Sequence, residues 1–199
     1  ETGEAEELSA RLGIRNFIDH LTAEECMAAF PTIQYHMDEP QSNPSSVPLY
    51  FLAKLAREQV TVVLSGEGAD EIYAGYEWYN DTPLMRRYKH IPAPFRRAAA
   101  GITRHLPYFK GHDFILHGTG RPEDYFIGQA YVFPEAEALS ILREPYRHGP
   151  SVRDIVTPIY KEAAGLSEVE KKQYLDLHLW LQGDILLKAD KMSMAHSLE

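Results

Sequence analysis

The feature that most constrains the fold of this chain is the run VTVVL at residues 60–64, which is followed at once by SGEGADE. Four of its five residues are apolar and four are β-branched. A strand that is apolar on both faces is typical of a parallel sheet with helices on each side. The run therefore predicts a buried parallel strand, and ligands bind at the carboxyl ends of such strands.

The chain before this run alternates between helix and strand signals. Residues 16–21, NFIDHL, alternate in polarity and predict a short strand. The next segment opens with the Thr22–Glu25 spacing of a capping box and predicts a helix that ends at Pro31. A loop rich in proline and serine and a further helix then lead to VTVVL. This alternation is the α/β pattern.

Strand signals fade after Tyr76, and the rest of the chain reads as helices with breaks. The fold class expected is therefore α/β, with a parallel sheet flanked by helices and a mostly helical second half. Within one domain over residues 1–199, we expect residues 1–76 to form an α/β nucleotide-binding part and residues 77–199 a helical part.

Composition excludes several classes of protein. The net charge of −9 argues against a general nucleic-acid binder. The single cysteine, Cys26, cannot form an intramolecular disulfide, which favours a reducing compartment and a cytoplasmic location. No apolar run approaches 20 residues, so we expect no membrane partner. Both ends of the chain suggest a piece of a longer protein.

Basic residues gather in one region of the helical half, and this feature has two interpretations. A solvated helix face is the ordinary one, and a phosphate or partner contact is the other. The residues are Arg86, Arg87, Lys89, Arg96, Arg97 and Arg104.

The loop after VTVVL combines glycines with carboxylates. Gly66 would allow a ligand to approach the backbone closely, and Ser65 offers a hydroxyl and a backbone N–H. Glu67 projects from the loop, and Asp70 could bind a magnesium ion. The structural alternative is an ordinary turn with acidic residues at a helix start, where the helix dipole favours anions.

The loop matches neither of two common phosphate-binding motifs. It contains no G-x-x-x-x-G-K-[ST] pattern, and GEGADE has glutamate where the dinucleotide fingerprint requires its third glycine. A nucleotide site built from glycine and carboxylates, without a cation of its own, implies Mg²⁺ bound together with the phosphates.

Three segments carry a family resemblance. They are VVLSGEGADEIYAGY at 62–76, DILLKADKMSMAHSLE at 184–199 and MDEPQSNPSSVPLYFLAKLA at 37–56. In this order and spacing they resemble the synthetase domain of glutamine-hydrolysing asparagine synthetases, in the ATP pyrophosphatase group. The resemblance covers the whole chain and implies a sheet of the adenine nucleotide alpha-hydrolase type.

The resemblance implies a ligase that forms a C–N bond. Aspartate would attack the α-phosphorus of ATP, giving β-aspartyl-AMP and pyrophosphate, and ammonia would then release asparagine and AMP. The ammonia would come from glutamine hydrolysis in an N-terminal domain absent here. ATP and Mg²⁺ are the implied cofactors, and aspartate and ammonia the partners. A homodimer is left open.

The resemblance also implies roles for residues of the loop. Ser65 and Gly66 would contact ATP, and Asp70 would be a metal ligand. Glu67 would act as a general base or orient the adenylated intermediate.

Two further residues lie outside the loop. Lys191 would stabilise the oxyanion of the tetrahedral intermediate in one cleft with Glu67. The alternative for Lys191 is a surface pair with Asp190 or Glu199, and Lys188 competes for its role. Asp38 could contact the substrate amino group, or it could be a turn aspartate.

The sequence departs from the family at both ends. The S-G-G-x-D-S loop that binds pyrophosphate is absent, and so is the segment that follows the last motif, so we expect the chain alone to be inactive. Two other functions stay open: a related amide-forming synthetase, of the β-lactam synthetase or peptide cyclase type, and a non-catalytic binding module.

Overall fold

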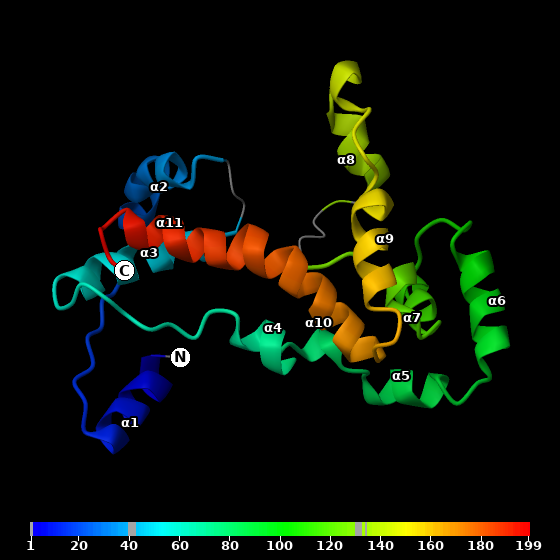
Figure 1. The fold of residues 1–199 in the computed structure, drawn as a ribbon, viewed down its shortest axis with the longest axis horizontal. Coiled ribbons are helices and arrows are strands. Elements are labelled where there is room, and N and C mark those ends of the chain that lie inside the picture. The colour runs from blue at the N-terminus through cyan, green and yellow to red at the C-terminus, as the bar shows by residue number, and fades with distance from the viewer. Residues whose placement is uncertain (1, 40–42, 130–132, 134) are drawn as a thin grey trace. The chain divides into compact units, whose positions relative to one another are not determined.

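The computed structural model describes residues 2–39, 43–129, 133 and 135–199 (Figure 1). These residues divide into two compact units. Unit 1 consists of Glu1–Glu67 and Asp184–Glu199, and unit 2 is Gly68–Gly183. The expected parts, residues 1–76 and 77–199, are defined by their functions, whereas these units are defined by compactness. The expected division therefore stays a prediction.

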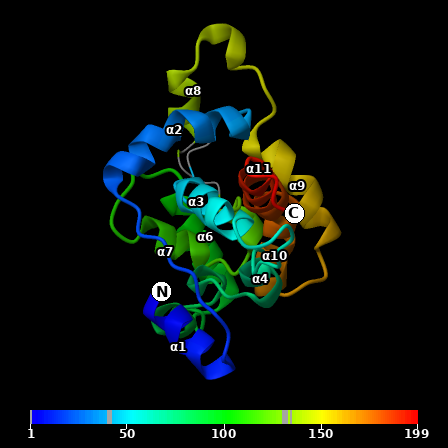
Figure 2. The same cartoon turned by 90° about the vertical axis from the view of Figure 1, so that its left-hand side faces the viewer.

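Unit 1 is built from helices. In Figures 1 and 2, α2, α3 and α11 pack against one another. Their shared core contains Ile33, Met37 and Met192, each at most 2% exposed. The helices of this unit are α1 (Thr2–Leu12), α2 (Ala23–Met37), α3 (Ser46–Arg57) and α11 (Leu187–Met194).

Helix α2 begins as expected and ends later than expected. The backbone N–H of Thr22 donates to Glu25 Oε2 (2.8 Å), and that of Glu25 donates to Thr22 Oγ1 (3.2 Å), which confirms the capping box. The predicted end at Pro31 is wrong, since the helix continues to Met37. Proline removes one helical hydrogen bond, but burial of Ile33 and Met37 favours continuing the helix. Part of the loop expected after α2, residues 40–42, lies outside the described residues.

The expected sheet is neither shown nor excluded, because no strand is assigned within residues 2–39, 43–129, 133 and 135–199. Residues 16–21, predicted as a strand, form no regular element. The expected burial of VTVVL on both faces is wrong in this chain: Val62 is 61% exposed and Leu64 is 100% exposed. A strand is buried only where neighbouring strands and helices cover it, and sequence pattern does not supply those neighbours.

The VTVVL run nevertheless makes one sheet-like contact. Val63 N–H donates to the Glu199 carbonyl (2.6 Å), and Glu199 N–H donates to the Thr61 carbonyl (2.9 Å). Glu199 thus bonds to Thr61 and Val63, the residues on either side of Val62. This is the hydrogen-bond pattern of one pair of residues in parallel strands. The run therefore pairs like a parallel strand at this step.

Unit 2 consists of short helices, and α9 and α10 share a buried cluster of Val156, Tyr160 and Leu175. Figure 1 shows α4 beside α10, and α9 also packs on α10. No helix in the described part of the chain is long and apolar enough to cross a membrane. The helices are α4 (Ala69–Tyr73), η1 (Glu77–Tyr79), α5 (Pro83–Tyr88), α6 (Ala93–Thr103), α7 (His112–His117), η2 (Pro122–Asp124), α8 (Glu135–Ile141), η3 (Glu144–Tyr146), α9 (Val152–Glu162) and α10 (Glu168–His178). A π-helix, η4 (Leu181–Leu186), links α10 to α11 and includes the boundary between the units.

Charged side chains tie the helices of unit 2 together. Lys89 forms ion pairs with Asp81 (2.7 Å) and Glu168 (2.5 Å), and Arg104 forms one with Asp124 (3.1 Å). Lys89 and Arg104 belong to the basic run, for which a solvated face and a ligand contact are the two interpretations. Both residues instead form ion pairs within unit 2.

The buried core of unit 1 generates a stability prediction. Met192→Ala leaves a cavity between α11 and α2, and we expect it to lower the free energy of unfolding by about 2–5 kcal/mol. Met194→Ala, on the same helix but 53% exposed, should change it by less than about 0.5 kcal/mol. Urea unfolding followed by circular dichroism measures both. Equal effects would contradict the packing of α11.

Unit 2 contains a carboxyl group with an unusual titration. Asp176 is fully buried, which raises its pKa to about 6 although the Tyr79 hydroxyl donates a hydrogen bond to it (2.7 Å). The unfolded value is about 3.9. Its contribution to stability is therefore complete below about pH 4 and is lost as the pH rises through about 6.

Asp176→Asn should remove this pH dependence. Relative to the wild type, the free energy of unfolding of the variant should rise by about 2 kcal/mol between pH 4 and pH 7. Asp154→Asn is the control, because a hydrogen bond from the Ser151 hydroxyl lowers the pKa of Asp154 and places its titration below this range. Unfolding curves at four pH values test this, and a constant difference between wild type and Asp176→Asn would refute it.

Candidate active site

The loop that follows VTVVL lies open at the surface of unit 1. Ser65, Gly66 and Glu67 are all exposed, and the backbone N–H of Glu67 approaches the Ser65 hydroxyl at 3.4 Å. A Cβ placed at Gly66 would meet no atom within 4 Å. The packing of the chain therefore does not require glycine here, whereas a ligand lying against the backbone would.

Asp70 belongs to unit 2, where it lies in the first turn of α4. Two glycines hold this turn. Gly68 has a φ of +87°, in the left-handed region that favours glycine. A Cβ at Gly75 would lie 2.1 Å from Asp70 Oδ1 and 3.2 Å from Asp70 Cα, so a side chain here would displace the Asp70 carboxylate, and Gly75 N–H donates to the Asp70 carbonyl (2.9 Å).

The residues present do not form a complete magnesium site. The described part of the chain contains no group of three or more His, Cys, Asp or Glu residues that could hold a metal ion. Magnesium requires six oxygen ligands in nearly octahedral geometry. Asp70 supplies one carboxylate, so most ligands would have to come from phosphates, water or residues outside this set.

The structure brings Lys191 and Asp38 together within unit 1. Lys191, on α11, donates a hydrogen bond to Asp38 Oδ2 and forms an ion pair with it. This hydrogen bond and charge lower the pKa of Asp38 and raise that of Lys191. The expected alternative partners, Asp190 and Glu199, do not take this role. Lys191 is 31% exposed and Asp38 is 69% exposed, so solvent can reach the pair.

Asp38 also has unusual backbone geometry. It ends α2 with a φ of +63°, which is uncommon for a residue other than glycine, although aspartate tolerates it better than most. This conformation directs the chain away from the helix at the residue that binds Lys191.

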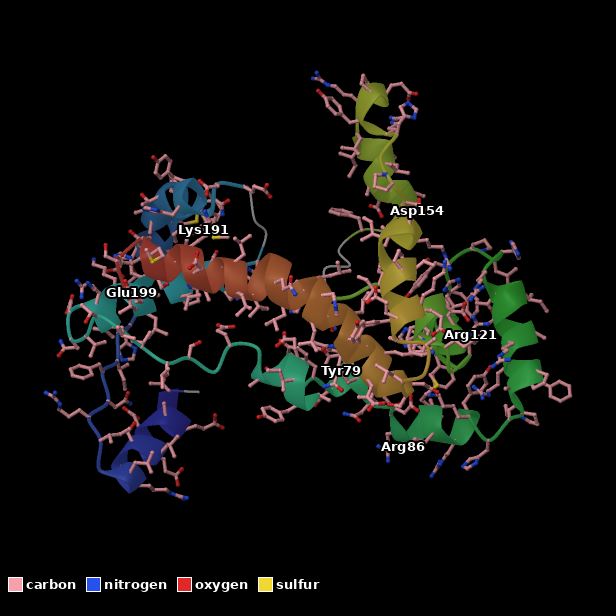
Figure 3. The ribbon with its side chains drawn as sticks, viewed as in Figure 1. Tyr79, Arg86, Arg121, Asp154, Lys191 and Glu199 are labelled. Carbon is pink, nitrogen blue, oxygen red and sulfur yellow. The ribbon has the colours of Figure 1, made fainter. Side chains whose placement is uncertain are left out.

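The two motif segments expected to form the site are joined directly. The backbone bonds between Val63 and Glu199 connect the strand-like run before Ser65 to the end of the segment that contains Lys191. Figure 3 labels Lys191 and Glu199 in this part of unit 1. That Glu67 and Lys191 face one cleft stays a prediction.

Sequence reasoning missed a polar contact that fixes the start of α3. Lys188 is 3% exposed and donates to the Ser45 hydroxyl (2.7 Å), and Asn43 Nδ2 donates to Asp184 Oδ2 (2.5 Å). Asp184 and Lys188 are four positions apart, and this spacing in the sequence indicates that both lie on one helix face. Nothing in the sequence indicates their partners, which lie more than 140 positions away.

Comparisons with known proteins identify the family. A family model described as asparagine synthase matches residues 1–199. The chain is 38% identical over its whole length to "Asparagine synthetase [glutamine-hydrolyzing] 1" of Bacillus subtilis (strain 168), of which it covers 32%. It is 39% identical over 94% of its length to "Putative asparagine synthetase [glutamine-hydrolyzing]" of Mycobacterium bovis, of which it covers 29%.

The chain therefore belongs to the asparagine synthase family, as its motifs predicted. It spans about a third of the length of these two relatives. No solved structure matches it.

Gly66 in the loop and Gly75 after α4 should respond differently to substitution. Gly75→Ala forces Cβ against Asp70 and should destabilise α4, while Gly66→Ala adds a methyl group in open space and should leave the folding stability within about 0.5 kcal/mol of wild type. Thermal unfolding of the two variants tests the difference. A large destabilisation by Gly66→Ala would show that the loop packs against the protein, and would remove the argument for ligand approach there.

Proposed function

We propose that this chain is part of the synthetase domain of an enzyme that converts aspartate to asparagine, using ATP and ammonia derived from glutamine. The observation that carries the proposal is the direct pairing of the two family motifs through Thr61, Val63 and Glu199. Family membership over residues 1–199 supports it.

In the proposed reaction, a side-chain carboxylate oxygen of aspartate attacks the α-phosphorus of ATP. The bond between the α-phosphorus and the bridging oxygen breaks, and pyrophosphate leaves. Ammonia then attacks the acyl carbon of β-aspartyl-AMP, loses a proton, and AMP leaves as asparagine forms. The open backbone at Gly66 and the hydroxyl of Ser65 are suited to contact the nucleotide.

Glu67 is proposed to act on the second step. Its exposed carboxylate projects from the same loop, so a nucleotide bound at Ser65 and Gly66 would lie beside it. A carboxylate there can accept the proton that the attacking ammonia loses, or hold the adenylated intermediate in the attacking geometry.

Lys191 and Asp38 are proposed to work as an exchangeable pair. In this structure the charge of Lys191 is neutralised by Asp38. The ammonium group of the aspartate substrate would compete for the same carboxylate. Substrate binding at Asp38 would then free Lys191 to stabilise the oxyanion that forms when ammonia attacks. The partial exposure of both side chains allows this exchange.

The test is pyrophosphate release from ATP by a full-length protein that contains this chain, with ammonia present and with or without aspartate. We expect release to depend on aspartate, and asparagine formation to fall at least about 100-fold in Glu67→Gln, as for loss of a general base. Glu58→Gln is the matched control, because Glu58 is also exposed and the charge change is identical.

Three outcomes separate the alternatives. Release that depends on another carboxylic acid would identify a related amide-forming synthetase. ATP binding without any release would identify a non-catalytic module. Equal activity of Glu67→Gln and Glu58→Gln would remove Glu67 from the mechanism. The 199-residue chain, assayed in parallel, tests the expectation that it is inactive by itself.

A further inference from the structure

Unit 2 contains a basic pocket that shares no residue with the candidate active site. The pocket has a volume of about 380 Å³, within the range of small-molecule sites. Arg121 and Lys171 line it, together with Arg153, Thr157 and Lys161 of α9. Figure 3 labels Arg121, and the adjoining helix η2 packs against α9.

The two carboxylates at this pocket are already neutralised. Glu123 lies 3.3 Å from Lys171 Nζ and 3.7 Å from Arg121 Nε. Asp124 lies 3.6 Å from Arg121 and 3.1 Å from Arg104, a member of the basic run noted in the sequence. The negative charges of Glu123 and Asp124 are therefore already paired with Lys171, Arg121 and Arg104, none of which belongs to α9.

Arg153 and Lys161 add two charges, and neither residue forms an ion pair with a described residue. They lie eight positions apart on α9 with Thr157 midway, so all three occupy one helix face over about 12 Å. The neighbouring Tyr160 hydroxyl is engaged, because it donates to the Phe126 carbonyl (2.7 Å). The free groups on this face are therefore two cations and one hydroxyl.

We propose that this pocket binds a small molecule that carries a phosphate or diphosphate group. Uncompensated cations in a concave site attract an anion, and arginine forms two parallel hydrogen bonds with phosphate oxygens. The 12 Å row suits several anionic oxygens better than one carboxylate. The pocket is small, and the chain has a net charge of −9, so a nucleic acid is not favoured.

Isothermal titration calorimetry of the 199-residue chain tests the proposal, with inorganic pyrophosphate as the probe and neither ATP nor aspartate present. We expect binding by the wild type and a Kd at least about tenfold higher in Arg153→Ala/Lys161→Ala, as for the loss of two charge-assisted hydrogen bonds. A second titration uses ribose 5-phosphate. Tighter binding of ribose 5-phosphate would identify a phosphate ester as the ligand, and tighter binding of pyrophosphate would identify a free phosphate or diphosphate.

The matched control is Arg87→Ala/Arg97→Ala, which removes the same two charges from unit 2 outside the pocket. Its Kd should stay within about twofold of the wild type, because distant surface charges are screened by salt. Thermal unfolding checks each variant, and Arg153→Gln/Lys161→Gln replaces the alanine variant if that one unfolds.

Three results would overturn the proposal. They are no pyrophosphate binding by the wild type, equal weakening in the two double variants, and tighter binding of hexaglutamate than of pyrophosphate. The last would indicate an acidic peptide. None of these results depends on whether the chain supports asparagine synthesis. A negative result for the pocket would therefore leave the proposed function unaffected, and a negative result for the proposed function would leave the pocket proposal unaffected.

Discussion

The candidate site depends on two backbone hydrogen bonds between the VTVVL run and Glu199. These bonds span more than 130 positions of sequence and connect the two motif segments. Because backbone bonds are independent of side-chain identity, this connection tolerates sequence change that would abolish a side-chain contact.

Sequence predicted local features well. Thr22 and Glu25 form their capping box, and the second half is helical with breaks, as expected. These signals succeed because hydrogen bonds within one turn decide them. Sequence failed at Pro31, where distant packing of Ile33 outweighed a local penalty, and at VTVVL, whose burial depends on neighbouring elements.

The site shows the same division between local and distant information. The position of Gly66 in an open loop follows from the residues around it. The pairing of Lys191 with Asp38 could not be predicted, because the sequence offered Asp190 and Glu199 as nearer candidates. Charge partners are chosen by the fold, and proximity in sequence ranks them poorly unless they share a helix face.

The exposure of VTVVL has a consequence for handling the chain. Its apolar side chains face solvent, and only one step of its backbone is paired with Glu199. Such a segment is a template onto which the same run of another molecule can add by backbone hydrogen bonds. Concentrated preparations of the chain should therefore self-associate through residues 60–64, and a charged substitution at Leu64 is the simplest way to keep the chain in solution.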